Sequence, residues 1–296
     1  QSLGYNQYVV SALEPFFYEA MLAGRGASLK NEAAAVGNLL LSPIMLRFPS
    51  GQLPNPADST GGLRKAPSPA TLAAFYRLYP TSIGLREAAR LRNWDTLLHP
   101  PAPPADVPLP PEARSVNLES SRMAVIRGGP WQVYFHYGQI DPSHAQAEAL
   151  NFEAAYGVHD VTHDPGTVGY GSPLHRDFYT RGIAHNVPLI DGEGQQRWNP
   201  GKLLHFTPSS VRARQDNYRP GYAAERSLRI EQGRLIDVVS LESVETAPRR
   251  LGLALHLQGE VELPVAFRPD PSLGFTAWEH PHSATFANEA ILNVKI

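Results

Sequence analysis

The sequence predicts an α+β protein in two parts, a helical N-terminal part followed by an antiparallel β-sandwich. Apolar residues recur at helical spacing up to about residue 97, a proline-rich stretch follows at 100–111, and beyond it the apolar period changes to two. A length of 296 residues fits two domains of ordinary size. We therefore expect a helical domain over 1–99, a proline-rich linker over 100–115 and a sandwich over 116–296.

The helical part contains two apolar stripes that a long loop separates. The first stripe comprises Val9, Leu13, Phe16, Phe17 and Ala20, and the second comprises Leu72, Phe75, Tyr76 and Tyr79. Between them the segment FPSGQLPNPADSTGG, residues 48–62, is too rich in Pro, Gly, Asn and Asp for a helix or a strand. Loops of this length in compact domains are usually functional or disordered.

The segment PPAPPADVPLPP, residues 100–111, has seven prolines in twelve positions and predicts a stiff, extended connector. After it come short segments with alternating apolar residues, separated by Gly, Pro, Asn and Asp. The clearest are 122–128, 131–138, 148–157, 226–242 and 249–267. Several such strands without helices between them favour an antiparallel sandwich.

Composition excludes several classes of partner and site. The formal charge of -2 provides no field that would recruit nucleic acid or an anionic membrane. No apolar run approaches the ~20 residues that a membrane span needs. The absence of cysteine excludes disulfides and thiolate chemistry but leaves cytoplasm and periplasm equally open. The sequence begins at Gln1 within what reads as the middle of a segment, so we expect a further N-terminal portion.

The stretch SHAQAEALNFEAAYG, residues 143–157, places a histidine and a glutamate inside an alternating run. If the run is a strand, His144, Gln146 and Glu148 share one face, and the opposite face is almost entirely alanine. The alanine face would pack against a second layer and turn the His144 face toward a cleft. The alternative is a solvated outer face with no function.

A turn-rich region follows that is dense in histidine and aspartate. It contains His159, His163, His175 and His185 together with Asp160, Asp164, Asp177 and Asp191. Each has an ordinary explanation as well, since DPGT is a common turn and His185 with Asn186 could be hydrogen-bonded inside the sandwich. A zinc site of His144, Asp164 and His185 is a further hypothesis, although spacing alone does not bring these residues together.

The N-terminal segment GYNQY places Tyr5 and Tyr8 at the entry to a helix. A tyrosine at that position is usually a packing residue. It is also a natural proton donor or acceptor where a cation or a desolvated pocket lowers its pKa from the ordinary value of about 10.

Three ordered motifs resemble a known family. SHAQAEALNFE, THDPGTVGYGSPLH and AHNVPLIDGEGQ, in this order and spacing, resemble the heparinase II/III-like polysaccharide lyases, and most closely family fifteen, the exolytic oligoalginate lyases. The opening QSLGYNQY is similar to the family's catalytic-tyrosine segment, and FPSGQLPNPADS is similar to a loop at the end of its helical toroid. The resemblance is specific from Gln1 to about Trp198 and weaker beyond.

The resemblance implies the C-terminal part of an (α/α) toroid followed by the sandwich, with an acidic oligosaccharide bound between them. The chemistry it implies is β-elimination at a uronic acid: a base takes the C5 proton, an acid protonates the leaving oxygen, and the carboxylate is neutralised. By this resemblance Tyr5 is the general acid, and His144 is the base or the carboxylate's partner. Glu148 orients a neighbouring side chain. The residues expected to line the substrate site with it are Tyr170, His175, Arg176 and His185.

The sequence departs from the family in two ways. Gln146 stands where related families have a zinc-ligating histidine, so no cofactor is expected to be required, although Asp164 and His185 match the other two ligands. The family's upstream catalytic segment does not occur in these 296 residues. We therefore expect another polypeptide, or an N-terminal part of the toroid, to complete the site.

The favoured function is an exolytic alginate lyase that acts on oligosaccharides in the bacterial cytoplasm or periplasm. An exolytic heparin or heparan sulfate lyase of the same family is the nearest alternative, because the few arginines near the expected cleft do not decide between them. A non-catalytic carbohydrate-binding sandwich is the alternative of another class. The joint presence of Tyr5 and His144 favours an enzyme.

Overall fold

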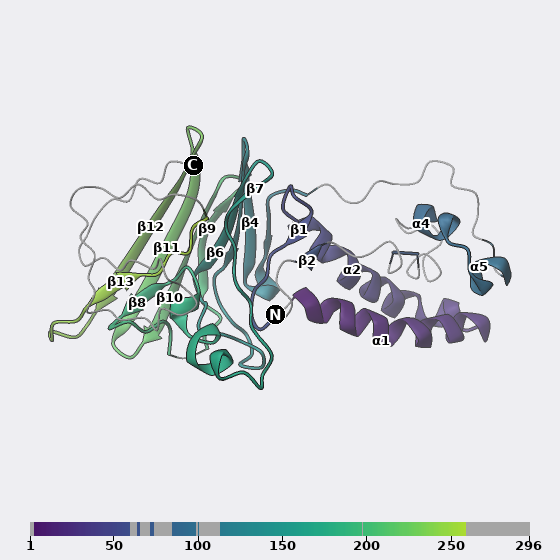
Figure 1. Ribbon diagram of the computed structural model, residues 1–296, viewed down its shortest axis with the longest axis horizontal. Helices are drawn as coiled ribbons and strands as arrows, with labels where there is room; N and C mark the ends of the chain where they lie inside the picture. The colour runs from purple at the N-terminus through teal and green to yellow at the C-terminus, as the bar shows by residue number, and fades with distance from the viewer. Residues whose placement is uncertain are drawn as a thin grey trace.

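The computed structural model describes residues 3–59, 64, 65, 72, 73, 85–98, 100, 113–196 and 198–258. A helical hairpin lies beside two antiparallel sheets that pack on each other (Figure 1). The antiparallel β architecture is therefore confirmed. Most of the predicted linker and most of the second helical stripe lie outside the described residues.

The first sheet has five antiparallel strands in the order β3-β4-β5-β6-β7. The strands are β3 Val116–Leu118, β4 Met123–Gly128, β5 Trp131–His136, β6 Asn151–Tyr156 and β7 His159–Thr162. A short 3-10 turn, Glu119–Ser121, connects the first two.

The second sheet has four antiparallel strands in the order β12-β11-β10-β9. The strands are β9 Lys202–Thr207, β10 Ser210–Arg219, β11 Tyr222–Glu231 and β12 Arg234–Ser243. A separate pair joins β8 Pro188–Ile190 to β13 Leu251–Leu253. Alternation along 226–242 predicted strand structure there, and the region forms the hairpin of β11 and β12.

Strand β5 shows why the first sheet is buried on both faces. Val133 and Phe135 pack into the core between the two sheets, together with Val211 and Leu228 of the second sheet. The alternate residues of β5 are buried too, among them Tyr134. They face the N-terminal part of the chain, so both faces of the strand are covered.

The helical part is a hairpin of α1, Leu3–Leu22, and α2, Lys30–Leu46, joined through a 3-10 turn at Gly26–Leu29. Val10, Phe17 and Val36 form the core between the two helices. The remaining described elements are α4 Leu85–Arg90, α5 Trp94–Leu98, β1 Gln52–Leu53 and β2 Arg64–Lys65. None of the helices described is long and apolar enough to cross a membrane.

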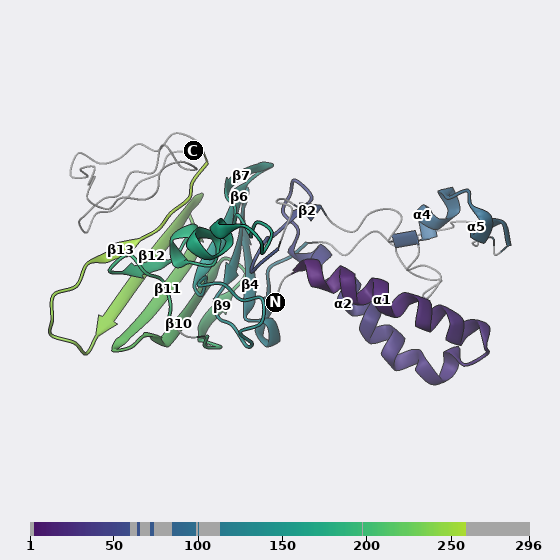
Figure 2. The same ribbon diagram turned by 60° about the horizontal axis from the view of Figure 1, so that its bottom comes forward.

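The end of α2 connects the hairpin to the sandwich. Leu46, Phe48 and Leu53 pack against Met123 and Tyr134 on the outer face of the first sheet. Figure 2 shows the hairpin projecting from this contact and away from both sheets. The segment after α2 is therefore fixed against the sheet, which positions the candidate site.

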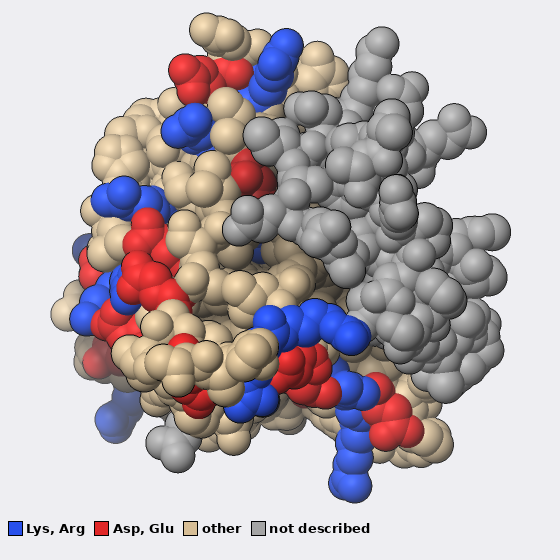
Figure 3. Space-filling model, turned by 90° about the vertical axis from the view of Figure 1, so that its left-hand side faces the viewer, with Lys and Arg blue, Asp and Glu red and all other residues tan. Residues whose placement is uncertain are grey.

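The second sheet has a charged outer face. Arg214 pairs with Glu242 at 2.7 Å, and Lys202 pairs with Asp216. Figure 3, which views the molecule from the side on which this sheet lies, shows basic and acidic side chains interspersed. Exposed pairs of this kind contribute little stability, and mixed signs create no extended field of one sign.

The prediction of a strand that includes His144 is wrong for the residues before Asn151. Strand β6 begins only at Asn151, and residues 143–150 form a turn-rich loop. His144 and Leu150 have φ values of 60° and 69°, in the left-handed region, which interrupts any strand. The N–H groups of Glu148 and Asn151 bond to carbonyls two and three residues back instead of to a neighbouring strand. The proposed polar and alanine faces therefore do not exist.

Candidate functional site

The segment after α2, residues 53–59, is buried throughout and docks onto the sandwich. Its backbone N–H groups at Asn55 and Ala57 donate to carboxylates of the sandwich. Asn55 donates to Glu153 at 2.8 Å, and Ala57 donates to Glu148 at 2.7 Å. These are charge-assisted hydrogen bonds in a dry environment, and they hold the docking segment, as we call residues 53–59, at a fixed position. Glu148 is therefore a structural anchor as well as a neighbour of the site.

The turn DPGT packs directly against the docking segment. Gly166 has a φ of +63°, and a Cβ there would lie 2.2 Å from the Ser59 carbonyl oxygen and 2.4 Å from Nδ2 of Asn55. Thr167 donates its backbone N–H to the same Ser59 carbonyl at 3.0 Å. Only glycine allows both the left-handed conformation and this close approach. The turn thus has a specific role in joining the two parts of the site.

His144 lies at the exposed edge of this contact. Its Nδ1 is 2.6 Å from Oδ2 of Asp58 in the docking segment and 3.0 Å from the Tyr170 hydroxyl. The Tyr170 hydroxyl also donates to Oδ2 of Asp58. The His144 side chain is 41% exposed whereas that of Asp58 is 3% exposed. A buried carboxylate therefore supports an imidazole that solvent reaches.

Two more of the sequence-predicted site residues lie in the same place. The rings of Tyr170 and His175 meet edge to face with centroids 4.9 Å apart. Nδ1 of His175 is 2.7 Å from the Thr167 hydroxyl, which fixes the ring. Arg176 is exposed on the following short helix, His175–Tyr179. The structure brings His144, Tyr170 and His175 together.

Beneath this exposed group are three buried histidine–carboxylate pairs. Nδ1 of His136 is 3.3 Å from Glu148, that of His163 is 2.7 Å from Glu153, and that of His185 is 2.6 Å from Asp164. All three carboxylate side chains are almost fully buried. A buried carboxylate requires a matching positive charge or hydrogen-bond donors. His185 is hydrogen-bonded to Asp164 and His163 is ion-paired with Glu153, whereas Nδ1 of His136 has no hydrogen-bond partner within the part of the chain that the structure describes.

Burial and pairing change the pKa values within this cluster. Burial raises the pKa of Glu153. Burial alone would lower the pKa of His163, but the charge of Glu153 and its hydrogen bond outweigh burial and raise it. The same balance, with Asp164 as partner, raises the pKa of His185. These three groups therefore hold protons more tightly in the folded protein than in the unfolded chain.

The free energy of unfolding is accordingly expected to fall as the pH rises from about 6 to about 8. The contribution of His163 and His185 is complete below the unfolded histidine pKa of about 6.5 and is lost as the pH rises through their raised folded values. Urea unfolding at a series of pH values measures this slope. His163→Gln should reduce it, whereas His159→Gln, at the exposed start of β7, which ends just before His163, should leave it unchanged. An equal slope in both variants would contradict the assignment.

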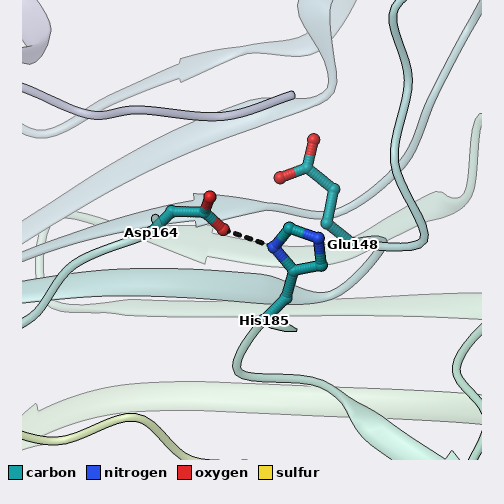
Figure 4. Close-up of side chains that lie close together, drawn as sticks. All are labelled: Glu148, Asp164 and His185. Atoms are coloured by element: carbon teal, nitrogen blue, oxygen red, sulfur yellow. Dashed lines mark hydrogen bonds and ion pairs between the residues drawn. The ribbon is translucent and has the colours of Figure 1, made fainter. Parts of the chain in front are cut away.

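Glu148, Asp164 and His185 each offer a ligand atom within 4.8 Å of the others (Figure 4). His144, which the sequence hypothesis placed with Asp164 and His185, is paired with Asp58 instead, so that trio is wrong. A closed zinc site takes four ligands from Cys, His, Asp or Glu, and these residues supply three. The amide of Gln146 is bonded to the Gly166 carbonyl. Among the described residues the set is one ligand short of a closed zinc site.

Purified protein is therefore expected to hold much less than about one equivalent of zinc, because the donor set is short of the four that a closed site uses. Elemental analysis after dialysis without chelator measures it. A full equivalent that disappears in Glu148→Gln but persists in Glu193→Gln, an exposed carboxylate paired with Arg181, would contradict this expectation.

Sequence reasoning did not identify Asp58, His136 or Glu153. A signal existed for Asp58, because it lies in the polar segment FPSGQLPNPADS that was expected to be functional. No sequence signal pointed to His136 or Glu153, since each lies within a strand among apolar neighbours. Tyr5 belongs to the first turns of α1, and its side chain lies outside the described residues.

Comparison with known proteins gives one family model and several solved structures. Residues 110–275 match the model described as heparinase II/III-like, C-terminal. A heparinase III, the BT4657 gene product, superimposes with a TM-score of 0.62 at 14% identity, over 86% of this chain and 40% of that chain. The heparan sulfate lyase HepC from Pedobacter heparinus gives 0.58 at 14% identity, over 77% and 35%. These likenesses show the fold, and the chain spans at most 40% of the length of these two structures. None of the curated proteins matches.

Proposed function

Because the chain belongs to the heparinase II/III-like family, whose C-terminal model covers residues 110–275, we propose that it forms part of a polysaccharide lyase. The reaction proposed is β-elimination within an oligosaccharide that contains uronic acid. The substrate is an acidic chain, and the bond broken is the one between C4 of the uronate and its glycosidic oxygen.

The observation that carries this proposal is the group of His144, Asp58 and Tyr170. A half-exposed imidazole that a buried carboxylate orients is the arrangement that a general base requires, because the carboxylate fixes the ring and stabilises the imidazolium that forms. The group lies where the docking segment of the helical part meets loops of the sandwich. A substrate bound there would contact both parts.

The reaction needs three functions, and the chain offers candidates for them. His144 takes the C5 proton or binds the uronate carboxylate. Tyr5 protonates the leaving oxygen, a role that rests on the resemblance of its segment. Arg176, which is exposed beside His175, is a candidate partner for a carboxylate because guanidinium can bind it through two hydrogen bonds.

The other predicted site residues divide into buried and exposed ones. Glu148 and His185 are fully buried, so we assign them to holding the docking segment and the 163–166 turn rather than to touching substrate. Tyr170 and His175 line the exposed side of the site. This division follows burial, because a fully buried side chain is unable to contact a polymer without movement of the loops.

We further propose that a preceding helical segment or a partner chain completes the site. This chain spans 40% of the length of the first heparinase III structure, and the exposed side of α1 carries large apolar side chains. Those residues are Tyr8, Val9, Leu13 and Phe16. In a complete (α/α) toroid a further helix would cover such a surface.

Heparan sulfate and alginate oligosaccharides are the two substrates to compare. The names of the similar structures favour heparan sulfate. The near-neutral formal charge of -2 favours an unsulfated uronate. Exolytic action is proposed from the resemblance alone.

The test is the ultraviolet absorbance of the C4=C5 double bond in unsaturated uronate. The complete protein, with any N-terminal portion, is supplied with heparan sulfate, heparin and alginate oligosaccharides in parallel. A rise in absorbance on one of them supports the proposal and selects the substrate. No rise on any, with folded protein, would contradict it.

A further inference from the structure

The geometry points to Asp58 as the positioning residue of His144, a role that rests on the proposed function. We propose that its carboxylate holds the imidazole as the Nδ1–H tautomer and so places the reactive lone pair on Nε2. Nδ1 of His144 is 2.6 Å from Oδ2 of Asp58, and an ionised carboxylate can only accept a hydrogen bond. The proton must therefore reside on Nδ1.

The surroundings of Asp58 strengthen this orientation. The Tyr170 hydroxyl donates to the same Oδ2, so two donors converge on one buried oxygen. The hydroxyl is also 3.0 Å from Nδ1 of His144, which makes the three groups mutually adjacent. Charge-assisted hydrogen bonds are the strong ones, and low solvent exposure of the carboxylate reinforces them.

A backbone hydrogen bond also joins Asp58 to His144. The Asp58 N–H donates to the His144 carbonyl at 3.3 Å, and His144 itself has a φ of 60°. A non-glycine residue in the left-handed region is strained and persists where surrounding contacts hold it there. The site therefore holds His144 in a conformation that a free loop would avoid.

Asp58 is not required to keep its own segment in place. The docking segment is anchored independently by the bonds from Asn55 to Glu153, from Ala57 to Glu148, and from Thr167 to the Ser59 carbonyl. Replacing Asp58 by asparagine, which has the same shape, would remove the charge and leave these three anchors. A purely structural role can thus be separated from a positioning role.

In the reaction, the C5–H bond breaks and its proton moves to Nε2 of His144. The electron pair forms the C4=C5 double bond, the C4–O bond breaks, and the general acid protonates the departing oxygen. The resulting imidazolium keeps its Nδ1 proton and donates a hydrogen bond through it to Asp58, which stabilises the positive charge as it develops. Solvent then restores the proton states of base and acid. Asp58 contacts no reacting atom.

Two measurements on the complete protein test the inference. The first is the lyase rate of Asp58→Asn and Asp58→Glu, with Asp177→Asn as the matched control at an exposed position on the short helix after Tyr170. Asp58→Asn is expected to lower kcat by ~10²–10⁴-fold with little change in KM. Asp58→Glu should recover part of that loss, and Asp177→Asn should match the unmutated protein.

The second measurement is independent of activity. Nitrogen NMR of selectively ¹⁵N-histidine-labelled protein, without substrate, reports which ring nitrogen carries the proton, and the signal is assigned by its loss in His144→Asn. The Nδ1–H tautomer is expected in the unmutated protein and a mixture in Asp58→Asn.

An Nε2–H tautomer in the unmutated protein would overturn the inference even if a variant fails to fold. So would a kcat for Asp58→Asn within about threefold of normal. Absence of lyase activity in the unmutated protein would contradict the proposed function. The tautomer measurement would still show whether Asp58 orients His144.

Discussion

Replacing His144 with asparagine is expected to lower kcat on the preferred uronate oligosaccharide by ~10²–10⁴-fold, the usual contribution of a general base. Asparagine is chosen because it tolerates the left-handed conformation that residue 144 adopts, so the loop should keep its path. It offers no group with which to take the C5 proton. The rate is followed by the absorbance of unsaturated uronate.

His205→Asn is the matched control for this variant. His205 is exposed on β9 of the second sheet, away from the docking segment, and its replacement should leave the rate unchanged. Thermal unfolding of both variants shows whether they fold. A loss smaller than about tenfold in a folded His144→Asn variant would remove His144 from the catalytic role.

Replacing Arg226 with methionine is expected to destabilise the sandwich by about 3–5 kcal/mol, the cost of breaking a buried ion pair. Arg226 is fully buried on β11, and its guanidinium binds both carboxylate oxygens of Asp237, with Nε 2.8 Å from Oδ1. It also donates to the Leu150 and Asn186 carbonyls and stacks over Phe152 at 4.5 Å. Methionine would fill the space and leave these partners without a donor.

Arg229→Met is the control for the stability measurement. Arg229 lies on the same strand, but its side chain is 49% exposed and pairs with Glu231. Surface replacements of this kind usually change stability by less than about 0.5 kcal/mol. Urea unfolding of both variants gives the comparison. Equal stability of the Arg226 and Arg229 variants would show that the buried guanidinium does not hold the two sheets together.

The strands could be predicted where apolar residues dominate the pattern. The run 122–128 contains β4, whose apolar residues 123–126 are all buried, and the region 226–242 forms most of the β11–β12 hairpin. β10 was missed because its alternation carries arginines at 212 and 214 on the outer face, which weakens an apolar pattern. Residues 143–150 were misread as a strand because alternation alone does not reveal the left-handed conformation of His144.

The candidate site could be predicted only in part. His144, Tyr170 and His175 were identified from the sequence, and the structure places Tyr170 in contact with both histidines. Asp58 is 86 residues before His144, and a pairing over that distance depends on how the docking segment lies against the sandwich. The buried pairs have the same origin. His163 directly follows β7, and it meets Glu153 because β7 pairs with β6 in the sheet.

The complete protein is expected to break its substrate by elimination. Mass spectrometry of the products from a size-defined heparan sulfate or alginate oligosaccharide tests this most directly. Elimination adds no water, so the masses of the two products should sum to the mass of the substrate, and one product should carry the double bond at its non-reducing end. Products whose summed mass exceeds that of the substrate by one water would show hydrolysis and contradict the account.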